Sequence, residues 1–271
     1  MKVLTIQDIS CYGQCSTTVA LPILSHYGHE TAILPSAILS THTCGFKDFT
    51  VLDLTDEMPK IIDHWIHERI KFDCIYTGYI GDKRQFDYIL KCKEELLVPG
   101  GLFIVDPAMA DNGKMYPGLS TEIIFGMRKL CSKADYIIPN ITEGCFLTGN
   151  DYKETHDTEY VNKLLKDLFD LGCKNVILTG VQEDSDTIGA VAYDGITRTY
   201  NLEVKEEKSY HGTGDIFSSI IVSDILNGKN LKDTLRHACK FIIEAIRKTV
   251  DDDNHSYGVK YEEVLRDEIN N

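Results

Sequence analysis

The sequence predicts an α/β protein: a three-layer sandwich whose mostly parallel central sheet carries helices on both faces and ends in an antiparallel edge. Short, wholly apolar runs alternate with segments of helical spacing along most of the 271 residues. A continuous apolar run is typical of a strand buried on both faces, as in a parallel sheet. Further on, two runs of alternating polarity flank Asp194-Gly195, which predicts an antiparallel hairpin.

The expected strands are short and end at polar or turn-forming residues. The first covers residues 2–7, and a second covers 31–34. The remaining expected strands are 73–76, 102–105, 136–138, 176–178 and the hairpin 188–204.

The expected helices lie between these strands, and several are followed by glycine, which commonly ends a helix. They are 16–27, 58–70, 85–97, 121–131, 159–171 and a helix that begins near 213–215 and ends before Gly228. The polar tail, 251–271, is expected to lie on the surface or in part to be loose. We see no repeat or linker, so we expect a single domain over residues 1–271.

The charge and the cysteines exclude several functions. The formal net charge is −14, which argues against a nucleic-acid partner because phosphate contacts need a basic patch. No apolar run has the roughly 20 residues of a membrane helix, and the N-terminus lacks the pattern of a signal peptide. Nine cysteines include no CxxC pair, which disfavours zinc and suits a reducing, cytoplasmic location.

Polar residues follow the expected strands, and the carboxyl ends of parallel strands are where open α/β sheets bind ligands. Each of these residues is equally explained as a strand terminator, but together on one edge they predict a site. They are Gln7-Asp8, Tyr79, Asp106 and Asp111, Asn140 and Glu143, and Thr179-Gly180.

A further helix start, His211-Gly212-Thr213-Gly214-Asp215, completes this edge. Glycines at a helix N-terminus let unpaired N–H groups approach a phosphate. Asp215 is a sensible general base for a hydroxyl that attacks a phosphoryl group. The alternative is that Asp215 is only a first-turn residue favoured by the helix dipole. Neither a P-loop nor a GxGxxG fingerprint is present.

The acidic residues predict a cation. Asn140 and Glu143, three apart, suit a magnesium ion that keeps its waters beside nucleotide phosphates. They equally suit a helix N-cap with its capping-box partner, and both interpretations can hold. Asp106 and Asp111 add carboxylates that would repel one another unless cations neutralise them.

In this order and at these spacings, the motifs resemble the pyridoxal and pyridoxamine kinases of the ribokinase-like superfamily. The matching elements are Ile6-Gln7, His42-Thr43, Thr77-Gly78-Tyr79, Asp106-Pro107, Asn140-x-x-Glu143 and Gly212-Thr213-Gly214-Asp215. The resemblance implies ATP-dependent phosphorylation of the 5′-hydroxymethyl group of a vitamin B6 compound. It also implies a dimer that needs Mg²⁺ and often a monovalent cation, K⁺ or Na⁺.

By resemblance, each motif takes a role. Asp215 is the catalytic base, and Gly212, Thr213 and Gly214 form the anion hole. ATP and its metal ions lie against Asp106, Asp111, Asn140, Glu143, Thr179 and Gly180. The substrate pocket includes His42, Thr43 and Tyr79. From the residues alone, Tyr79 is also explained as a core tyrosine, and His42 as a structural hydrogen-bonder.

The chain departs from this family at Asp8, where well-known pyridoxal kinases have serine. An ionised aspartate would favour a protonated pyridine ring. Asp8-Ile9-Ser10 also resembles the start of hydroxymethylpyrimidine kinases, so Asp8 and Ser10 are assigned to the substrate pocket. A hydroxymethylpyrimidine kinase is therefore the alternative, although those enzymes commonly have cysteine in place of Asp215. A non-catalytic B6- or nucleotide-binding protein is the alternative of another class.

Overall fold

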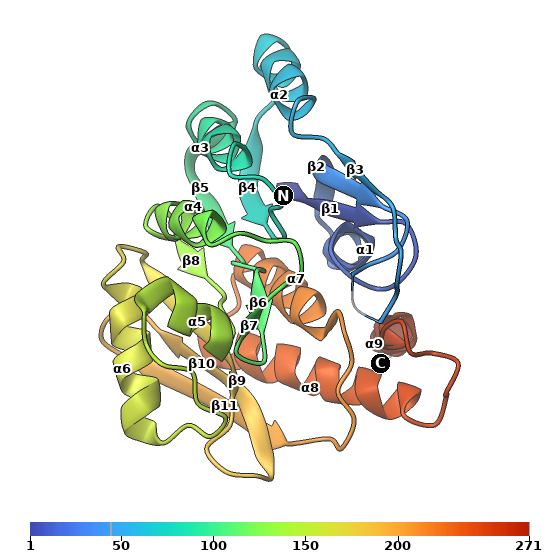
Figure 1. Ribbon diagram of the computed structural model, residues 1–271, viewed down its shortest axis with the longest axis vertical. Coiled ribbons are helices and arrows are strands. Elements are labelled where there is room, and N and C mark those ends of the chain that lie inside the picture. The colour runs from blue at the N-terminus through green and yellow to red at the C-terminus, as the bar shows by residue number, and fades with distance from the viewer. Residues whose placement is uncertain (44, 271) are drawn as a thin grey trace.

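The computed structural model describes residues 1–43 and 45–270, and a nine-stranded sheet forms its centre (Figure 1). The strand order is β11-β10-β9-β8-β5-β4-β1-β2-β3. Strands β2, β1, β4, β5, β8 and β9 are parallel, whereas β3 at one edge and β10 and β11 at the other are antiparallel. The strands are β1 (Lys2–Ser10), β2 (Glu30–Leu39), β3 (Val51–Asp53), β4 (Phe72–Thr77), β5 (Leu97–Val105), β8 (Tyr136–Ile137), β9 (Asn175–Val181), β10 (Thr187–Tyr193) and β11 (Arg198–Val204).

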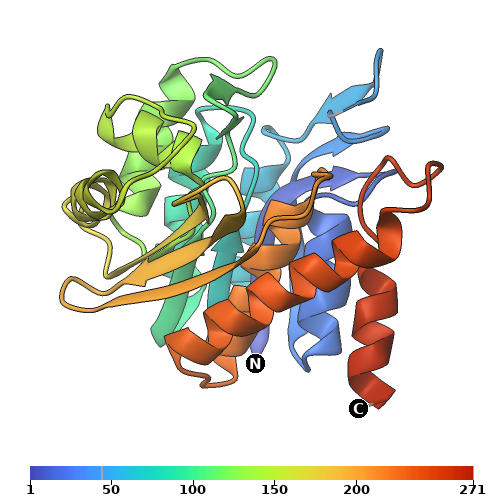
Figure 2. The same cartoon turned by 90° about the horizontal axis from the view of Figure 1, so that it is seen from below.

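Helices cover both faces of this sheet, as Figure 2 shows from below. One face carries α2 (Met58–His67), α3 (Gln85–Glu95), α4 (Glu122–Cys131), α5 (Ile141–Thr148) and α6 (Thr158–Phe169). The other face carries α1 (Thr17–His26), α7 (Thr213–Leu226), α8 (Leu231–Thr249) and α9 (Tyr261–Asn270). The predicted three-layer α/β class and its antiparallel hairpin are therefore confirmed.

Alternating side chains of the central strands supply the two cores. In β4, Cys74 and Tyr76 point to the α1/α7/α8 face, and Ile75 points to the α2–α6 face. In β5, Ile104 points to the α1/α7/α8 face and Val105 points to the α2–α6 face. Because both faces are buried, the strand needs apolar residues throughout, which is why it reads as an unbroken apolar run.

Several elements were not foreseen. β2 extends beyond residue 34 to Leu39, and β3 pairs with its end. A small hairpin of β6 (Ala110–Asp111) and β7 (Lys114–Met115) follows β5, and α8 supplies a long helix after α7. Strands of two or three residues are too short for periodicity to reveal.

The expectation of a partly loose tail over 251–271 is wrong for its second half. α9 begins at Tyr261 and buries Tyr261, Val264 and Leu265 in the same core as α7 and α8. Spacings of three and four residues place these side chains on one helix face, which is enough to dock an otherwise charged helix. Within residues 1–43 and 45–270, no helix combines the length and the apolar character that crossing a membrane requires.

Candidate active site

The predicted site residues gather at one edge of the sheet. The strands β9, β8, β5, β4 and β1 are consecutive neighbours, so their carboxyl ends form a continuous row. The N-terminus of α7 faces this row: α7 packs against α1, and its Ser218 hydroxyl bonds the carboxylate of Asp106 at the end of β5. The fold thus brings together residues that are 112 positions apart in the sequence.

Asp215 lies in the first turn of α7, half-buried, and is held by the loop after β1. Its Oδ2 accepts a hydrogen bond of 2.9 Å from the backbone N–H of Ser16. Burial raises the pKa of Asp215 to about 6, the Ser16 N–H opposes this rise, and the charge of Asp8 adds to it. A carboxyl group with a pKa just below neutrality is ionised at pH 7 and is still basic enough to take a proton.

Gly212 is the N-cap of α7 and requires the absence of a side chain. Its φ is +82°, and a Cβ at this position would lie 1.8 Å from the carbonyl oxygen of Gln14. Gly214 lies two residues further along the helix. No atom lies within 4 Å of the position that its Cβ would take. The Thr213 hydroxyl donates to the carbonyl of Tyr210. The helix start is therefore packed against the loop at Gly212 and open at Gly214, where an anion can approach the N–H groups.

Asp106 follows β5 and is almost fully buried. Its Oδ2 accepts a hydrogen bond of 2.6 Å from the Ser218 hydroxyl, one turn into α7 from Asp215. Burial first, and the charge of Asp215 second, raise the pKa of Asp106 to about 8, while Ser218 opposes the rise. The charge of Asp215 therefore disfavours ionisation of Asp106.

This raised pKa predicts how Asp106→Asn changes stability with pH. In the folded protein the carboxyl keeps its proton up to about pH 8, whereas an unfolded aspartate releases it near pH 4. The wild type therefore loses stability as the pH rises between these values, and the asparagine variant does not. We expect the variant's advantage in unfolding free energy to grow by about 2–4 kcal/mol from pH 5 to pH 8.

Thermal unfolding at both pH values, in metal-free buffer, measures this difference. Asp87→Asn is the matched control, because Asp87 lies on the surface in an ion pair with Lys129 and should have nearly the same effect at both. The prediction is contradicted if the difference in unfolding free energy between Asp106→Asn and the wild type is the same at pH 5 and pH 8.

Asn140 and Glu143 form the capping box that the sequence left as one alternative. The Asn140 side chain accepts from the Glu143 N–H at 2.9 Å, and the Glu143 carboxylate accepts from the Asn140 N–H at 2.8 Å. Glu143 also accepts from the N–H of Met109, so it fixes the strand-end loop after Asp106. Burial and then the charge of Asp106 raise the pKa of Glu143, and these backbone N–H groups oppose the rise.

Thr179 and Gly180 lie beside this capping box. The Thr179 N–H donates to the carbonyl of Pro139, and a parallel bridge joins Thr179 to Asn140. Gly180 has φ +72° and has no atom within 4 Å of the position of a Cβ. A glycine here keeps the end of β9 open on the side where the resemblance places the nucleotide.

Asp8, Ser10 and Tyr79 lie at the other end of the row. Asp8 is 3% exposed, and its carboxylate accepts from the Ser10 hydroxyl at 3.0 Å. Burial raises the pKa of Asp8, opposed by the hydroxyls of Ser16 and Ser10 and by the charge of His42. Tyr79 is half-buried, and the charge of Asp8 contributes to raising the pKa of its phenol. An aromatic ring and a buried carboxyl therefore share this part of the site.

His42 and Thr43 lie in the connection between β2 and β3. The His42 Nε2 is 3.1 Å from the carbonyl oxygen of Tyr257, so the ring donates this hydrogen bond, as its structural interpretation requires. His42 also lies against Gly13, where a Cβ would be 2.1 Å from the ring. Thr43 follows it and is half-buried.

The fit to a magnesium ion can be judged from the donors present. In the described residues, no three Asp, Glu, His or Cys side chains are placed to hold a metal by themselves. Asp111 is exposed on β6, where its carboxylate accepts from the backbone and side chain of Asn112. Asp106 and Glu143 remain as buried carboxyls, and the charge of Asp106 raises the cost of ionising Glu143. One or two carboxylates completed by water and phosphate suit Mg²⁺, so the residues fit the ion only together with a nucleotide.

Three functional candidates were missed by sequence reasoning. Ser16 binds Asp215 through its N–H, and Ser218 binds Asp106. Tyr116, after β7, is close enough to the acidic row that Glu143, Asp215, Asp111 and Asp106 all raise the pKa of its phenol, after burial. The spacing of Ser218, three residues after Asp215, was the one available signal, since it places both on the same helix face.

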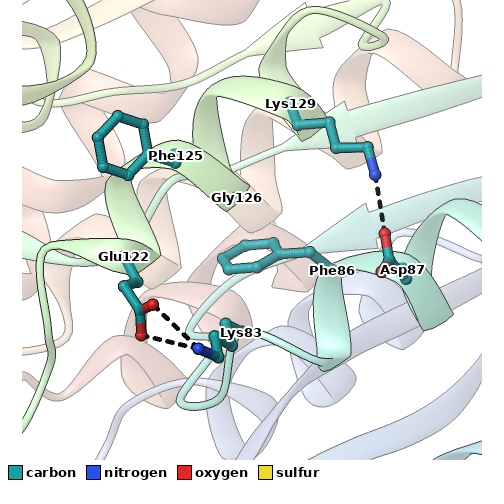
Figure 3. A pocket seen from close by; sticks show the side chains of 7 residues that line it. All are labelled: Lys83, Phe86, Asp87, Glu122, Phe125, Gly126 and Lys129. Carbon is teal, nitrogen blue, oxygen red and sulfur yellow. Dashed lines mark hydrogen bonds and ion pairs between the residues drawn. The ribbon is translucent and has the colours of Figure 1, made fainter.

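A separate cavity of about 320 Å³ lies between α3 and α4 and holds none of these residues (Figure 3). Two ion pairs flank it, Lys83–Glu122 at 2.9 Å and Lys129–Asp87 at 2.8 Å. Gly126 lies over Phe86, where a Cβ would be 2.0 Å from the ring. The cavity therefore lies where α3 and α4 pack against each other, and Asp106, Glu143 and Asp215 do not line it.

Comparisons with known proteins identify the family of this chain. The phosphomethylpyrimidine kinase family model matches residues 23–260. A candidate phosphomethylpyrimidine kinase from Bacteroides thetaiotaomicron, crystallised with pyridoxal, is 36% identical with a TM-score of 0.92 and coverage of 98% of this chain and 94% of that one. Pyridoxal kinase from Lactobacillus plantarum is 30% identical with a TM-score of 0.89, over 98% and 95% of the two chains. A hydroxymethylpyrimidine/phosphomethylpyrimidine kinase from Aquifex aeolicus is 30% identical over 92% of this chain and 95% of its own length. The chain therefore belongs to the phosphomethylpyrimidine kinase family, with pyridoxal kinases among its relatives, and the resemblance drawn from the sequence is confirmed.

Proposed function

We propose that this protein transfers the γ-phosphoryl group of ATP to the 5′-hydroxymethyl group of pyridoxal, pyridoxamine or pyridoxine, in vitamin B6 salvage. The observation that carries the proposal is Asp215, held by the Ser16 N–H at the glycine-rich start of α7 with a pKa of about 6. Pyridoxal in the structure of the 36% identical Bacteroides protein supports the choice of substrate. A binding module would have no use for such a base.

In this mechanism, Asp215 removes the proton of the attacking hydroxyl. The hydroxyl oxygen then forms a bond to the γ-phosphorus, and the bond between that phosphorus and the bridging oxygen of ADP breaks. The N–H groups of Gly212, Thr213 and Gly214 stabilise the charge on the moving phosphoryl group. Tyr79 lies against the flat ring, and Asp8, Ser10, His42 and Thr43 bind its substituents.

The nucleotide would lie between Thr179, Gly180 and the acidic pair Asp106 and Glu143. No lysine or arginine is among the groups that shift the pKa of these two carboxyls. A triphosphate beside them therefore needs a cation, and Mg²⁺ would neutralise charge between the phosphates and the acidic row. We propose Asp106, Asp111 and Glu143 as its surroundings. A monovalent cation, a homodimer and a cytoplasmic, single-domain enzyme complete the proposal.

The alternative, phosphorylation of hydroxymethylpyrimidine, is supported by the family model and by the Aquifex relative. Asp8-Ile9-Ser10 also resembles the start of hydroxymethylpyrimidine kinases. Asp215 weighs against this alternative, because those enzymes commonly have cysteine at that position.

A substrate panel tests the proposal. The protein is incubated with ATP and Mg²⁺ and, in turn, pyridoxal, pyridoxamine, pyridoxine or hydroxymethylpyrimidine, and ADP and the phosphorylated product are measured together. We expect turnover on the B6 compounds and a changed preference among them in Asp8→Ser. Turnover on hydroxymethylpyrimidine alone would establish the alternative, and no turnover on any of the four would refute kinase activity of either kind. Incubation without an acceptor measures background ATP hydrolysis.

A further inference from the structure

The loop between β1 and α1, residues 11–16, lies between the catalytic helix start and the C-terminal part of the chain. On its inner side, the Ser16 N–H holds the carboxylate of Asp215, and the Gln14 carbonyl packs against Gly212. Ser16 has φ +55°, a conformation that is unfavourable for a residue with a side chain. Such a conformation persists only when the surroundings enforce it, so something must hold this loop in place.

The segment 255–262 does so from the outer side. The Tyr257 carbonyl oxygen lies 3.1 Å both from the Gln14 N and from the Nε2 of His42. One carbonyl group therefore fixes both the loop beside the catalytic base and the histidine of the substrate pocket. Figure 2 shows the red loop before α9 approaching the blue end of β1.

The side chain of Gln14 adds a second attachment. Its Nε2 donates to both carboxylate oxygens of Glu262, at 2.9 and 3.0 Å. Gly258 leaves room for it, since a Cβ there would lie 2.5 Å from the Gln14 Cβ and Oε1. Tyr261, buried at the start of α9, donates from its hydroxyl to the carbonyl of Thr18 in α1.

Aromatic rings line the same junction. Tyr12 of the loop contacts Tyr257, with ring centroids 5.1 Å apart, and also Phe46 at 5.8 Å. A cavity of about 510 Å³ remains between the loop and the segment, so packing alone does not fill this interface. The hydrogen bonds of Gln14 and Tyr261 and the ring contacts of Tyr12 therefore hold the loop and the segment together around this cavity.

From these contacts we infer that Gln14 is a positioning residue for the catalytic base, and that the segment 255–262 is a structural part of the active site. The inference rests on the proposed function for its catalytic consequence. Gln14 touches neither substrate nor phosphate; it sets the place of the Ser16 N–H, and through it the direction in which Asp215 faces the hydroxyl.

Exchanging the two partners tests this. Gln14→Glu places two carboxylates opposite each other, and we expect kcat to fall about fivefold to twentyfold with an unchanged KM for ATP, because small displacements of a base are costly. Adding Glu262→Gln restores a donor–acceptor pair with its direction reversed, and kcat should return to within about twofold of the wild type. Glu263→Gln, the same change at the neighbouring position, is the control and should leave kcat unchanged.

Amide hydrogen exchange of residues 11–18 gives a second readout that does not depend on turnover. We expect faster exchange in Gln14→Glu, confined to this loop and reversed in the double variant. A role in overall stability alone would lower the melting temperature, spread the faster exchange over α1 and α9, and spare kcat. An unchanged kcat with unchanged exchange, or a loss that the double variant does not restore, would overturn the inference. If the wild type phosphorylates no acceptor, the proposed function fails while the exchange experiment still decides the positioning role.

Discussion

Asp215→Ala is expected to lower kcat for phosphorylation of the B6 substrate about 10²–10⁴-fold, the usual range for losing a general base. The KM for ATP should change little, because the carboxylate faces the acceptor hydroxyl and not the phosphates. Steady-state kinetics with a saturating acceptor measures the effect. If kcat stays near the wild-type value, Asp215 is only a first-turn helix residue.

Asp215→Ala should not destabilise the folded protein. Burial raises the pKa of Asp215 to about 6, so its stabilising effect is complete at low pH and is lost as the pH rises through 6. At pH 8 an uncharged residue replaces a carboxylate whose ionisation the fold opposes, although the bond from Ser16 is lost. A melting temperature at or near the wild-type value, together with the loss of kcat, therefore separates catalysis from folding.

The same pKa gives the pH dependence of the wild type. The base acts only when ionised, so kcat/KM for the acceptor, which reports the free enzyme, should rise with pH through a limb near 6 and then level off. Asp215→Ala should lack this limb.

Gly212→Ala is expected to have the second large effect, on both stability and turnover. An alanine at φ +82° is unfavourable, and its methyl group would lie against the carbonyl of Gln14 at 1.8 Å. We expect the free energy of unfolding to fall by about 2–4 kcal/mol, because the unfavourable backbone conformation and the overpacking both destabilise the folded protein. The loop and the helix start must separate, so kcat should fall about 10²-fold through misplacement of Asp215.

Two other glycines serve as matched comparisons. Gly28 has φ +89° and free space around it, and lies after α1, away from the site. Gly28→Ala should therefore cost about 1–2 kcal/mol in stability without changing kcat. Gly214 lies inside α7 with open space beside it, so Gly214→Ala should keep or raise the melting temperature but increase the KM for ATP. A wild-type KM for ATP in that variant would argue against phosphate binding at the start of α7.

The parts of the fold that could be predicted are those in which one side-chain pattern decides the structure. The strands that became β4 and β5 needed apolar residues on both faces, and the hairpin had its own turn signal at Asp194-Gly195. The short β3, β6 and β7 depend on pairing with distant strands, which no local pattern encodes. For α9, the signal was present as Tyr261, Val264 and Leu265, but the charged residues between them concealed it.

The site divides along similar lines. Asp215 and Asp106 lie at strand ends and helix starts, so topology alone predicts their place. Ser16 acts through its backbone N–H, and Gln14 through contacts with residues about 245 positions later, so neither has a recognisable side-chain signature. Asp111 lies in the β6–β7 hairpin, whose path the sequence did not reveal.

The contact between Gln14 and Glu262 spans 248 positions, nearly the whole chain. During synthesis the loop that supports Asp215 emerges long before the segment that holds it. Contacts between residues so far apart in the sequence form slowly, because the intervening chain must first be closed into a loop. A variant that ends before residue 255 therefore keeps the glycine-rich helix start and the base in its sequence, but lacks the Tyr257 carbonyl and the Glu262 carboxylate that hold the loop beside them. In the arrangement that we infer, the base is therefore held in place only once α9 has been made and has docked against the core.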